Sequence, residues 1–442
     1  MNWHGLHLVH VSEFWRWIVR TFAWLLTVVW VLRTYDAVQL IPTLPDLTFP
    51  DWDGLPEGLP TLTVVVPARD EAEKIGATIE ALMVADYAAI KVLVVDDRST
   101  DGTGAIVDAY VEEYAWRRPG ALGAIHIEEL AEGWLGKTFA MMVATENSSS
   151  DYLLFTDADV LFSPSVLRRA LVCARDTEAD HLVVLPTVEV KSRGEGIVLG
   201  FLQVMSLWAT RPWMVEDPKA RRDVAGIGAF NLVRRDALNE IGGWLPQRMA
   251  VLEDITLGRR IRAAGMRQRM AFAPGMVLVH WAKGGYGLLT NMTKNLFSAF
   301  GFQPVFVVLM CVWVGVFFLL PLAGLAWWGT VVQALVILCC IGASYRVMGE
   351  ASRIDARYAW LYPLGAVAIM FAMLRSMVVV MFQRGVRWRG TVYPLRDLRA
   401  HNSPFVWERE ARKKRDEEVR ATRVARRLAE KAGRSEKAGR KG

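Results

Sequence analysis

Hydrophobic positions between residues 61 and 185 follow two alternating patterns, one typical of buried strands and one typical of helices. Short apolar runs rich in Val, Leu and Ile predict strands at 61–66, 91–95, 152–156 and 181–185. Helical patterning lies between and after them, at 71–83, 104–114, 138–145 and 164–175. Because the strands and helices alternate, we expect an α/β domain with a mostly parallel central sheet that is covered on both faces.

Longer apolar runs flank this part of the chain. Those at 304–328, 329–345 and 358–382 each approach the roughly 20 residues that a membrane span needs. A weaker run at 17–32 contains Arg20 and lacks a signal-peptide cleavage pattern, so we interpret it as an anchor or an interfacial helix. The predicted divisions are an N-terminal membrane anchor or interfacial helix (1–42), a linker (43–60), the α/β domain (61–302), α-helical transmembrane segments (303–383) and a basic tail (384–442).

Composition and charge agree with a membrane location. Hydrophobic residues make up 53% of the chain, and the mean hydropathy of +0.22 is high for a soluble protein. From Arg384 onward there are 19 Lys and Arg against 8 Asp and Glu, a net charge of +11, which leaves −5 of the total of +6 for the rest. A basic tail beside apolar segments favours anionic lipid headgroups over nucleic acid, and we expect no nucleic-acid partner. A solvated tail without such contacts fits the same composition.

The charge distribution raises a question of membrane topology. Four crossings would place the α/β domain and the basic tail on opposite sides, whereas the positive-inside rule places the tail in the cytoplasm. One apolar segment is therefore expected to be re-entrant or interfacial, and the N-terminal one with its arginines is the first candidate. We expect a multi-pass protein of the cell (inner) membrane with its α/β domain in the cytoplasm. The four cysteines show neither metal-ligand spacing nor a disulfide framework.

Carboxylates follow two of the predicted strands and begin a later helix. Asp96-Asp97 and Asp157-Ala158-Asp159 come directly after buried apolar runs, and Glu253-Asp254 opens a helical run at 255–264. Parallel sheets bind ligands at the carboxyl ends of their strands, so one crevice for a metal ion and a phosphorylated ligand is expected. Mg²⁺ prefers a few carboxylates together with ligand phosphates. A carboxylate at a helix start can act as a general base, although acids there also stabilise the helix dipole.

Another turn has features of a phosphate site. The run 133–138 reads Gly-Trp-Leu-Gly-Lys-Thr and opens a helix, so its free amides would suit a phosphate and Lys137 would add charge. It is not a P-loop, because the run Gly-x4-Gly-Lys-Ser/Thr is absent.

Taken together, these motifs over about 60–300 resemble the family 2 glycosyltransferases, which have the GT-A nucleotide-sugar-binding fold. The resemblance implies that Pro67, Arg69 and Glu71 line the nucleoside pocket. It implies that Asp97 binds the base, uracil by family expectation, and that Gly136 and Lys137 lie near the donor.

The same resemblance assigns the catalytic and metal positions. Asp157 and Asp159 would hold the sugar diphosphate, with Asp159 the main ligand of Mg²⁺ or Mn²⁺. Asp254 would deprotonate the acceptor, which gives direct displacement with inversion at the anomeric carbon. The acceptor or sugar region would include Gly228, Trp244 and Glu253.

The layout of the C-terminal half narrows the class. A catalytic domain followed by apolar spans resembles membrane-bound lipid glycosyltransferases, such as bacterial carotenoid- and hopanoid-associated enzymes and ceramide glucosyltransferases. We therefore expect an inverting, metal-dependent hexosyltransferase that moves a sugar from a nucleotide-sugar donor, a UDP-sugar by expectation, to a lipid hydroxyl or carboxylate. The alternatives are a processive polysaccharide synthase, a nucleotidyltransferase that releases pyrophosphate, and a non-catalytic scaffold.

One motif departs from the related families. Polysaccharide synthases and ceramide glucosyltransferases carry Gln/Arg-x-x-Arg-Trp roughly forty residues after the base, and the corresponding region here lacks it. The run from Arg384 to Trp388 fits the pattern but lies beyond the apolar spans, so we interpret it as a basic-aromatic membrane anchor. Lys294 and His280 remain candidates for acceptor or phosphate contacts. Arg375, inside an apolar segment, either snorkels to the interface or meets an acceptor headgroup.

Overall fold

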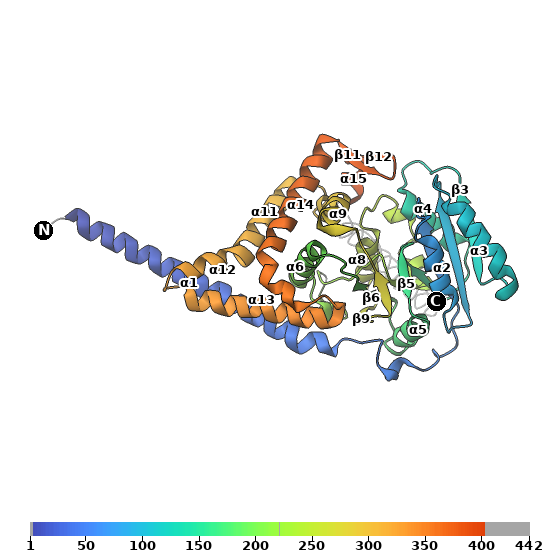
Figure 1. Cartoon of the computed structure of the whole chain (residues 1–442), viewed down its shortest axis with the longest axis horizontal. Helices are drawn as coiled ribbons and strands as arrows, with labels where there is room; N and C mark the ends of the chain where they lie inside the picture. Colours follow the sequence, from blue (N-terminus) through green and yellow to red (C-terminus); the bar gives the residue numbers. More distant parts are fainter. Residues whose placement is uncertain (1–2, 221, 403–442) are drawn as a thin grey trace, which may run out of the picture.

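A seven-stranded sheet forms the centre of the α/β domain (Figure 1). The computed structural model describes residues 3–220 and 222–402. The strands lie in the order β3 (Leu122–Ile127), β2 (Ile90–Asp97), β1 (Leu62–Ala68), β4 (Tyr152–Phe155), β8 (Asn231–Arg234), β6 (His181–Leu185) and β9 (Gln268–Phe272). All neighbours pair in parallel except β8, which is antiparallel to both β4 and β6. The predicted α/β class with a mostly parallel sheet is confirmed.

Two small sheets accompany the central one. The first consists of β5 (Val160–Phe162), β10 (Val277–Val279) and β7 (Thr187–Val188), and the second is a hairpin of β11 (Gly385–Trp388) and β12 (Thr391–Pro394). The helices of the α/β domain are α2 (Ile75–Met83), α3 (Thr103–Arg117), α4 (Gly136–Glu146), α5 (Val166–Asp176), α6 (Arg193–Ala209), α7 (Arg235–Glu240), α8 (Glu253–Ala263), α9 (Gly284–Asn291) and α10 (Thr293–Ala299). The remaining helices are α1 (Trp3–Leu40), α11 (Pro304–Val314), α12 (Leu320–Ala323), α13 (Val331–Ser352), α14 (Tyr362–Phe382) and α15 (Leu395–Asn402).

Successive side chains of the central strands lie in two separate cores, one on each face of the sheet, because side chains of a strand alternate between its faces. In β1, Val64 and Val66 belong to the core beneath α2, α3 and α5, whereas Val65 belongs to the core beneath α4, α7 and α8. All three valines are fully buried. A strand buried on both faces is continuously apolar, which is why the run was recognisable in the sequence.

The predicted elements agree with the observed ones at most positions, and among the elements that were predicted the main difference is the start of α2. That helix was expected from residue 71 but begins at Ile75. Side chains at the start of α3 and in the loop before it bind backbone N–H groups at the expected start: Glu71 N donates to Thr103 Oγ1, and Ala72 N donates to Asp101 Oδ2. The segment therefore forms a turn and not a first helical turn.

Within residues 3–220 and 222–402, four helical segments are long and apolar enough to cross a membrane: Glu13–Thr43, Pro304–Ala326, Val331–Ser352 and Ala356–Phe382. α1 lies beside α13, and together with α11 and α12 these helices project from one side of the α/β domain (Figure 1). α14 packs against α6 and α10 of that domain, and α13 also contacts α6. A third core joins the apolar helices to the α/β domain. Its fully buried residues include Phe201 of α6, Ile369 of α14, and Phe318 from the segment between α11 and α12.

The chain beyond α14 returns to the α/β domain. After the β11–β12 hairpin, α15 ends at Asn402, whose side chain donates to Met249 O at 2.8 Å and accepts from Val251 N at 3.0 Å. The helical pattern predicted for 408–431 lies outside the described residues. The described part of the predicted tail, 384–402, is therefore structurally part of the domain.

Candidate active site

The carboxyl ends of β1, β2 and β4 meet at one edge of the sheet, as the sequence predicted for Asp97 and Asp157. Asp97 is the last residue of β2 and is 5% exposed. Its carboxylate accepts a 2.7 Å bond from Arg98 Nε and lies 3.7 Å from Arg69 Nη1. Two arginine side chains therefore fix the position of this buried carboxylate at the end of β2.

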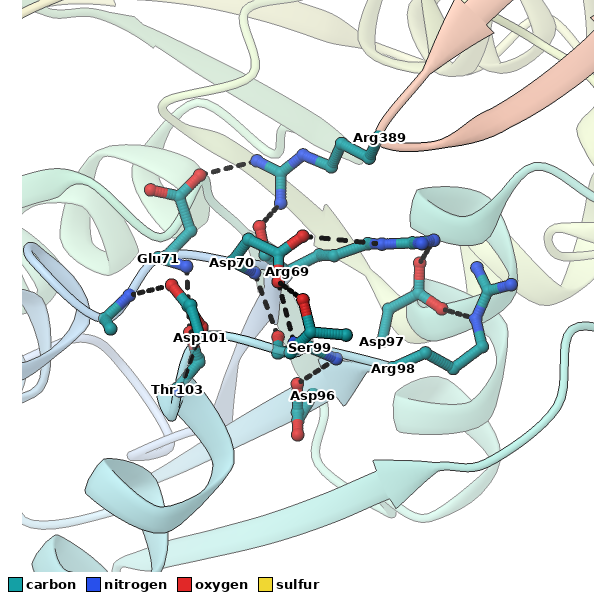
Figure 2. A network of polar contacts seen from close by, with 12 residues as sticks. Arg69, Asp70, Glu71, Asp96, Asp97, Arg98, Ser99, Asp101, Thr103 and Arg389 are labelled. Atoms are coloured by element: carbon teal, nitrogen blue, oxygen red, sulfur yellow. Dashed lines mark hydrogen bonds and ion pairs between the residues drawn. The ribbon is translucent and has the colours of Figure 1, made fainter.

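The loop after β1 and the loop after β2 are hydrogen-bonded to each other beside Asp97 (Figure 2). Asp70 N donates to Ser99 Oγ at 2.9 Å, and Thr100 N donates to Asp70 Oδ1 at 2.8 Å. Asp70 and Arg98 both have left-handed backbones, with φ of 53° and 58°. Such conformations cost about 1–3 kcal/mol each and persist where the surroundings determine them, often at functional sites.

The start of α4 packs directly on the carboxylate of Asp97. A Cβ at Gly136 would overlap Asp97 Oδ2, so only glycine permits this approach. The next residue, Lys137, lies between two carboxylates, at 2.5 Å from both Asp157 Oδ1 and Glu253 Oε1. The loop predicted to sit near a phosphate thus connects the end of β2 with the end of β4 and the start of α8.

Charges around Lys137 shift the neighbouring pKa values in opposite directions. Burial alone would lower the pKa of Lys137, but Asp157 and Glu253 outweigh burial and raise it above its ordinary value. Burial alone would raise the pKa of Asp157, but the Lys137 ammonium outweighs it and the pKa is lowered, with help from Lys294 and Arg389. Asp157 therefore stays ionised at neutral pH and Lys137 stays charged.

Asp254 is set apart from these carboxylates by its pKa. Burial, followed by repulsion from Glu253, raises the pKa of Asp254 to about 6, while Lys137 opposes the shift. Ile255 N donates to Asp254 Oδ1 at 2.7 Å, and a Cβ at Gly226 would overlap the Asp254 carbonyl. A carboxylate with a raised pKa near the operating pH can take a proton from a reacting group.

Asp159 and Asp157 offer only oxygen ligands, which suit a hard divalent cation. Among the residues that the structure describes, no three His, Cys, Asp or Glu side chains converge on one point. Lys74 Nζ lies 2.7 Å from Asp159 Oδ2, and the Lys74 side chain is 46% exposed. An exposed ion pair contributes at most about 1 kcal/mol, so a cation carrying its own phosphate ligands could replace Lys74. The residues fit a metal ion bound largely through its ligand.

The β11–β12 hairpin brings residues to this edge that the sequence had placed at a membrane surface. The guanidinium of Arg389 donates to the carbonyl of Arg69 and pairs with Glu71 (Figure 2). Tyr393 Oη accepts a 3.4 Å bond from Gly136 N. Arg389 and Gly390 both have positive φ, as in a type I′ turn, where an arginine is unfavourable without a role for its side chain.

Lys294 also belongs to the site. Its ammonium lies 4.0 Å from the centre of the Trp388 ring, a cation–π contact. Burial, and next the charge of Lys137, lower the pKa of Lys294 to about 8. The Arg384–Trp388 run is therefore part of the edge where the carboxylates lie, a position that the anchor interpretation had not predicted. The sequence signal that could have predicted this position was the match of Arg384–Trp388 to the Gln/Arg-x-x-Arg-Trp pattern.

Three other residues that were predicted to belong to the site differ in how far they lie from its carboxylates and in how deeply they are buried. A Cβ at Gly228 would come within 2.7 Å of Asp157 Oδ2, so Gly228 lines the same carboxylate. Pro67 is partly buried in β1, opposite Val95. Trp244 is 2% exposed and packs on Phe155 with ring centres 4.8 Å apart, in the core behind the site.

His280 does not join the cluster. Its Nε2 lies 3.4 Å from Glu195 Oε2, and Glu195 also accepts 2.7 Å bonds from Lys191 N and Gly284 N. These contacts place His280 in a structural network at the start of α6.

Comparisons with known proteins identify a relationship for the α/β domain. Residues 63–242 match the family described as Glycosyl transferase family 2. The chain is 22% identical over 256 residues to the 4,4'-diaponeurosporenoate glycosyltransferase of Staphylococcus aureus (strain MRSA252), covering 57% of this chain and 65% of that protein. It is 23% identical over 262 residues to the probable glycosyltransferase YdaM of Bacillus subtilis (strain 168), covering 57% and 59%. The chain thus spans less than two thirds of both relatives.

Similar solved structures are more distant. The mannosyltransferase PcManGT from Pyrobaculum calidifontis, in complex with GDP-Man and Mn²⁺, matches with a TM-score of 0.47 and 18% identity, covering 82% of this chain and 98% of that one. Residues 1–349 of S. aureus TarS match with a TM-score of 0.38 and 15% identity, covering 74% and 93%. The family match over residues 63–242 and the mostly parallel sheet agree with the α/β fold class predicted from the sequence.

Proposed function

We propose, from the match of residues 63–242 to the family described as Glycosyl transferase family 2, that the chain is an inverting, membrane-bound enzyme that transfers a sugar from a nucleotide-sugar donor to a lipid acceptor. The observation that carries the proposal is the continuous set of contacts from Asp97 through Gly136 and Lys137 to Asp157 and the start of α8. The apolar helices beside this domain support a lipid acceptor and a multi-pass location in the cell membrane, with the domain in the cytoplasm.

The proposed reaction is a single displacement. Asp254 accepts the proton of the acceptor hydroxyl, whose oxygen forms a bond to the anomeric carbon. The bond between that carbon and the diphosphate oxygen breaks, and its electron pair leaves with the nucleoside diphosphate. Lys137 stabilises the negative charge that develops on the leaving diphosphate, because a fixed cation in a partly buried site needs no reorganisation. An acceptor carboxylate would attack without needing the base.

The donor is proposed to lie along the rim of the sheet. Asp97 accepts a hydrogen bond from the base, and Pro67, Arg69 and Glu71 line the nucleoside pocket. Gly228 and Glu253 border the sugar on the side of α8, and Trp244 supports them from the core. A uracil base remains an expectation of the family.

A divalent cation, Mg²⁺ or Mn²⁺, is proposed to be held by Asp159 and Asp157 together with the diphosphate. When bound, it supplies charge neutralisation for the leaving group. Chelation with EDTA is expected to abolish turnover, and added Mg²⁺ or Mn²⁺ to restore it. Asp159→Ala should weaken donor binding in the presence of metal, measured by titration calorimetry, while Asp236→Ala at an exposed helix start should not. Undiminished turnover in EDTA would show that Lys137 suffices and would remove the metal from the proposal.

Arg389 is proposed to bind the donor after releasing Glu71. Charge-assisted hydrogen bonds contribute about 1.5–3 kcal/mol, so Arg389→Ala is expected to raise the KM for the donor about 10- to 100-fold, with a smaller change in kcat. Arg396→Ala, an exposed arginine in α15, is the matched control and should leave KM unchanged. Equal KM values for the two variants would mean that the contact of Arg389 with Glu71 is structural only.

Turnover of nucleotide sugars by the purified protein tests the proposed function. UDP-glucose, UDP-N-acetylglucosamine and GDP-mannose are supplied with Mg²⁺ or Mn²⁺ and mixed bacterial lipids in detergent. Release of a nucleoside diphosphate that depends on added lipid is the expected result. A growing polymer would identify a processive synthase, and release of pyrophosphate a nucleotidyltransferase. No nucleotide binding would contradict the proposal and favour a scaffold.

A further inference from the structure

The outer face of α14 carries one continuous apolar stripe. Its exposed residues recur every three or four positions, which places them on a single side of the helix. They are Trp360 just before the helix, then Leu364, Val367, Phe371, Leu374, Val378, Met381 and Phe382. Trp360 is 88% and Phe382 89% exposed, so the stripe extends over the full length of α14. No polar residue interrupts this row, which indicates an apolar environment along the whole helix.

The inner face of α14 packs on the α/β domain from end to end. Near its start, Gly365 lies so close to α6 that a Cβ would come within 2.5 Å of Phe201. Near its end, Ser376 Oγ accepts a 3.0 Å bond from Phe297 N of α10 and donates to the carbonyl of Thr293. If α14 crossed the bilayer, α6 and α10, which pack along it, would also have to lie within the hydrocarbon layer.

The segments on both flanks of α14 also contact the α/β domain. Before the helix, Tyr358 lies against Gly196 of α6, and the Arg353 guanidinium lies against Gly275. After the helix, Arg389 pairs with Glu71 and Tyr393 contacts Gly136. Both ends are thus on the side of the membrane where the domain lies. Figure 1 shows α14 running across the direction in which α1 and α13 project.

These contacts decide how many times the chain can cross between α10 and the hairpin. Because Arg389 returns to the domain, the number of crossings in between must be even. The segment 304–326 and α13 form one outgoing and one returning helix, so α14 contributes none. The sequence had put the N-terminal run forward as the interfacial segment, and the contacts of α14 single out this helix instead.

We propose that α14 lies in the plane of the membrane, with its apolar stripe inserted among the acyl chains of the leaflet that faces the α/β domain. Lipid is the occupant because α11 packs against α14 and has its own exposed apolar residues, Val305, Val308 and Val312, so the two surfaces share one environment. The inference rests on the membrane location in the proposed function but not on its chemistry.

This placement accounts for two features of the sequence. Arg375 donates to Thr293 Oγ1 of α10, on the domain side, and therefore need not enter the hydrocarbon. The basic stretch after Arg384 starts on the same side as the α/β domain, which agrees with the positive-inside rule for a cytoplasmic domain. The hairpin that follows α14 then presents Trp388 and Lys294 close to the membrane surface, where a lipid acceptor would arrive.

Depth measurements with spin labels test the proposal on the full chain in vesicles of phosphatidylethanolamine and phosphatidylglycerol. Cysteines are introduced singly at Leu364, Phe371 and Val378 in a Cys339→Ser background, since Cys339 is the exposed native cysteine among the described residues. Val312 of α11 serves as the control for a crossing helix, and Trp116, 91% exposed on α3, as the control for water. Collision rates with oxygen and with a water-soluble nickel complex give the depth of each label.

The three α14 labels are expected at one shallow depth, with Val312→Cys clearly deeper and Trp116→Cys in water. A deep label at Phe371 between shallow labels at Leu364 and Val378 would show that α14 crosses, and would overturn the proposal. Labels shielded from both reagents would show that protein, such as a second copy of this chain, covers the stripe, which also overturns it. A water-exposed label at Val312 would instead refute the membrane location itself, so the two failures are distinguishable.

Discussion

Replacing Asp254 by asparagine is expected to lower turnover about 10²- to 10⁴-fold, the range typical of a lost general base, while donor affinity stays unchanged. Asparagine keeps the size of the side chain but cannot accept the proton of the acceptor hydroxyl. The measurement is the rate of nucleoside diphosphate release, beside donor binding by titration calorimetry. Asp236→Asn, at the exposed start of α7, is the matched control and should leave both quantities unchanged.

The pH dependence gives this prediction a second readout. Because the pKa of Asp254 is raised to about 6, turnover should fall as the pH drops through that value. Above its raised pKa, the ionised Asp254 carboxylate destabilises the folded state. At a pH below the ordinary pKa of an aspartate, the carboxyl is protonated in both the folded and the unfolded state, and this cost is absent. Asp254→Asn should therefore raise the melting temperature at pH 8 more than at pH 4. Wild-type turnover in the asparagine variant would exclude Asp254 as the base.

Replacing Lys137 by methionine is expected to reduce both stability and turnover. Methionine fills a similar space but leaves Asp157 and Glu253 without their shared cation. Breaking a buried ion pair costs about 3–5 kcal/mol, and the lower end applies here because the Asp157 side chain is 40% exposed. Turnover should fall about 10²- to 10³-fold, because the leaving diphosphate loses a fixed cation.

A double variant separates the two effects. Lys137→Met with Glu253→Gln removes one of the two unpaired carboxylates, so part of the lost stability in thermal unfolding should return while turnover stays low. Lys137 also lowers the pKa of Asp254, so the acid limb of the remaining activity should move to higher pH in Lys137→Met. Recovery of turnover in the double variant would mean that Lys137 acts only on folding.

The central strands and their terminal acids could be predicted from the sequence because burial on both faces leaves a continuous apolar run that ends abruptly. The predicted strand at 181–185 coincides with β6, and Asp97 and Asp157 lie where their runs end. β3 was missed because it is an edge strand containing Gly123 and His126, with only its first and last residues buried. Antiparallel β8 was missed because nothing local to a four-residue strand specifies its partner.

The remaining parts of the site depend on contacts that no local pattern encodes. Arg389 and Glu71 are 318 positions apart, and Lys137 reaches Glu253 from a different loop. The sequence suggested that Arg384–Trp388 is a membrane anchor, because the run follows an apolar segment and because Trp and Arg suit interfaces. The packing of α14 on α6 and α10 brings the following hairpin to the edge of the sheet where the carboxylates lie, and no local pattern encodes that return.

The stereochemistry and mass of the lipid product test the central claim most directly. The lipid formed from a donor of known anomeric configuration is isolated, weighed by mass spectrometry, and its anomeric coupling measured by nuclear magnetic resonance. The account predicts one sugar per lipid with a configuration opposite to that of the donor. A retained configuration would contradict direct displacement assisted by Asp254, and donor hydrolysis without any glycosylated lipid would contradict the lipid acceptor.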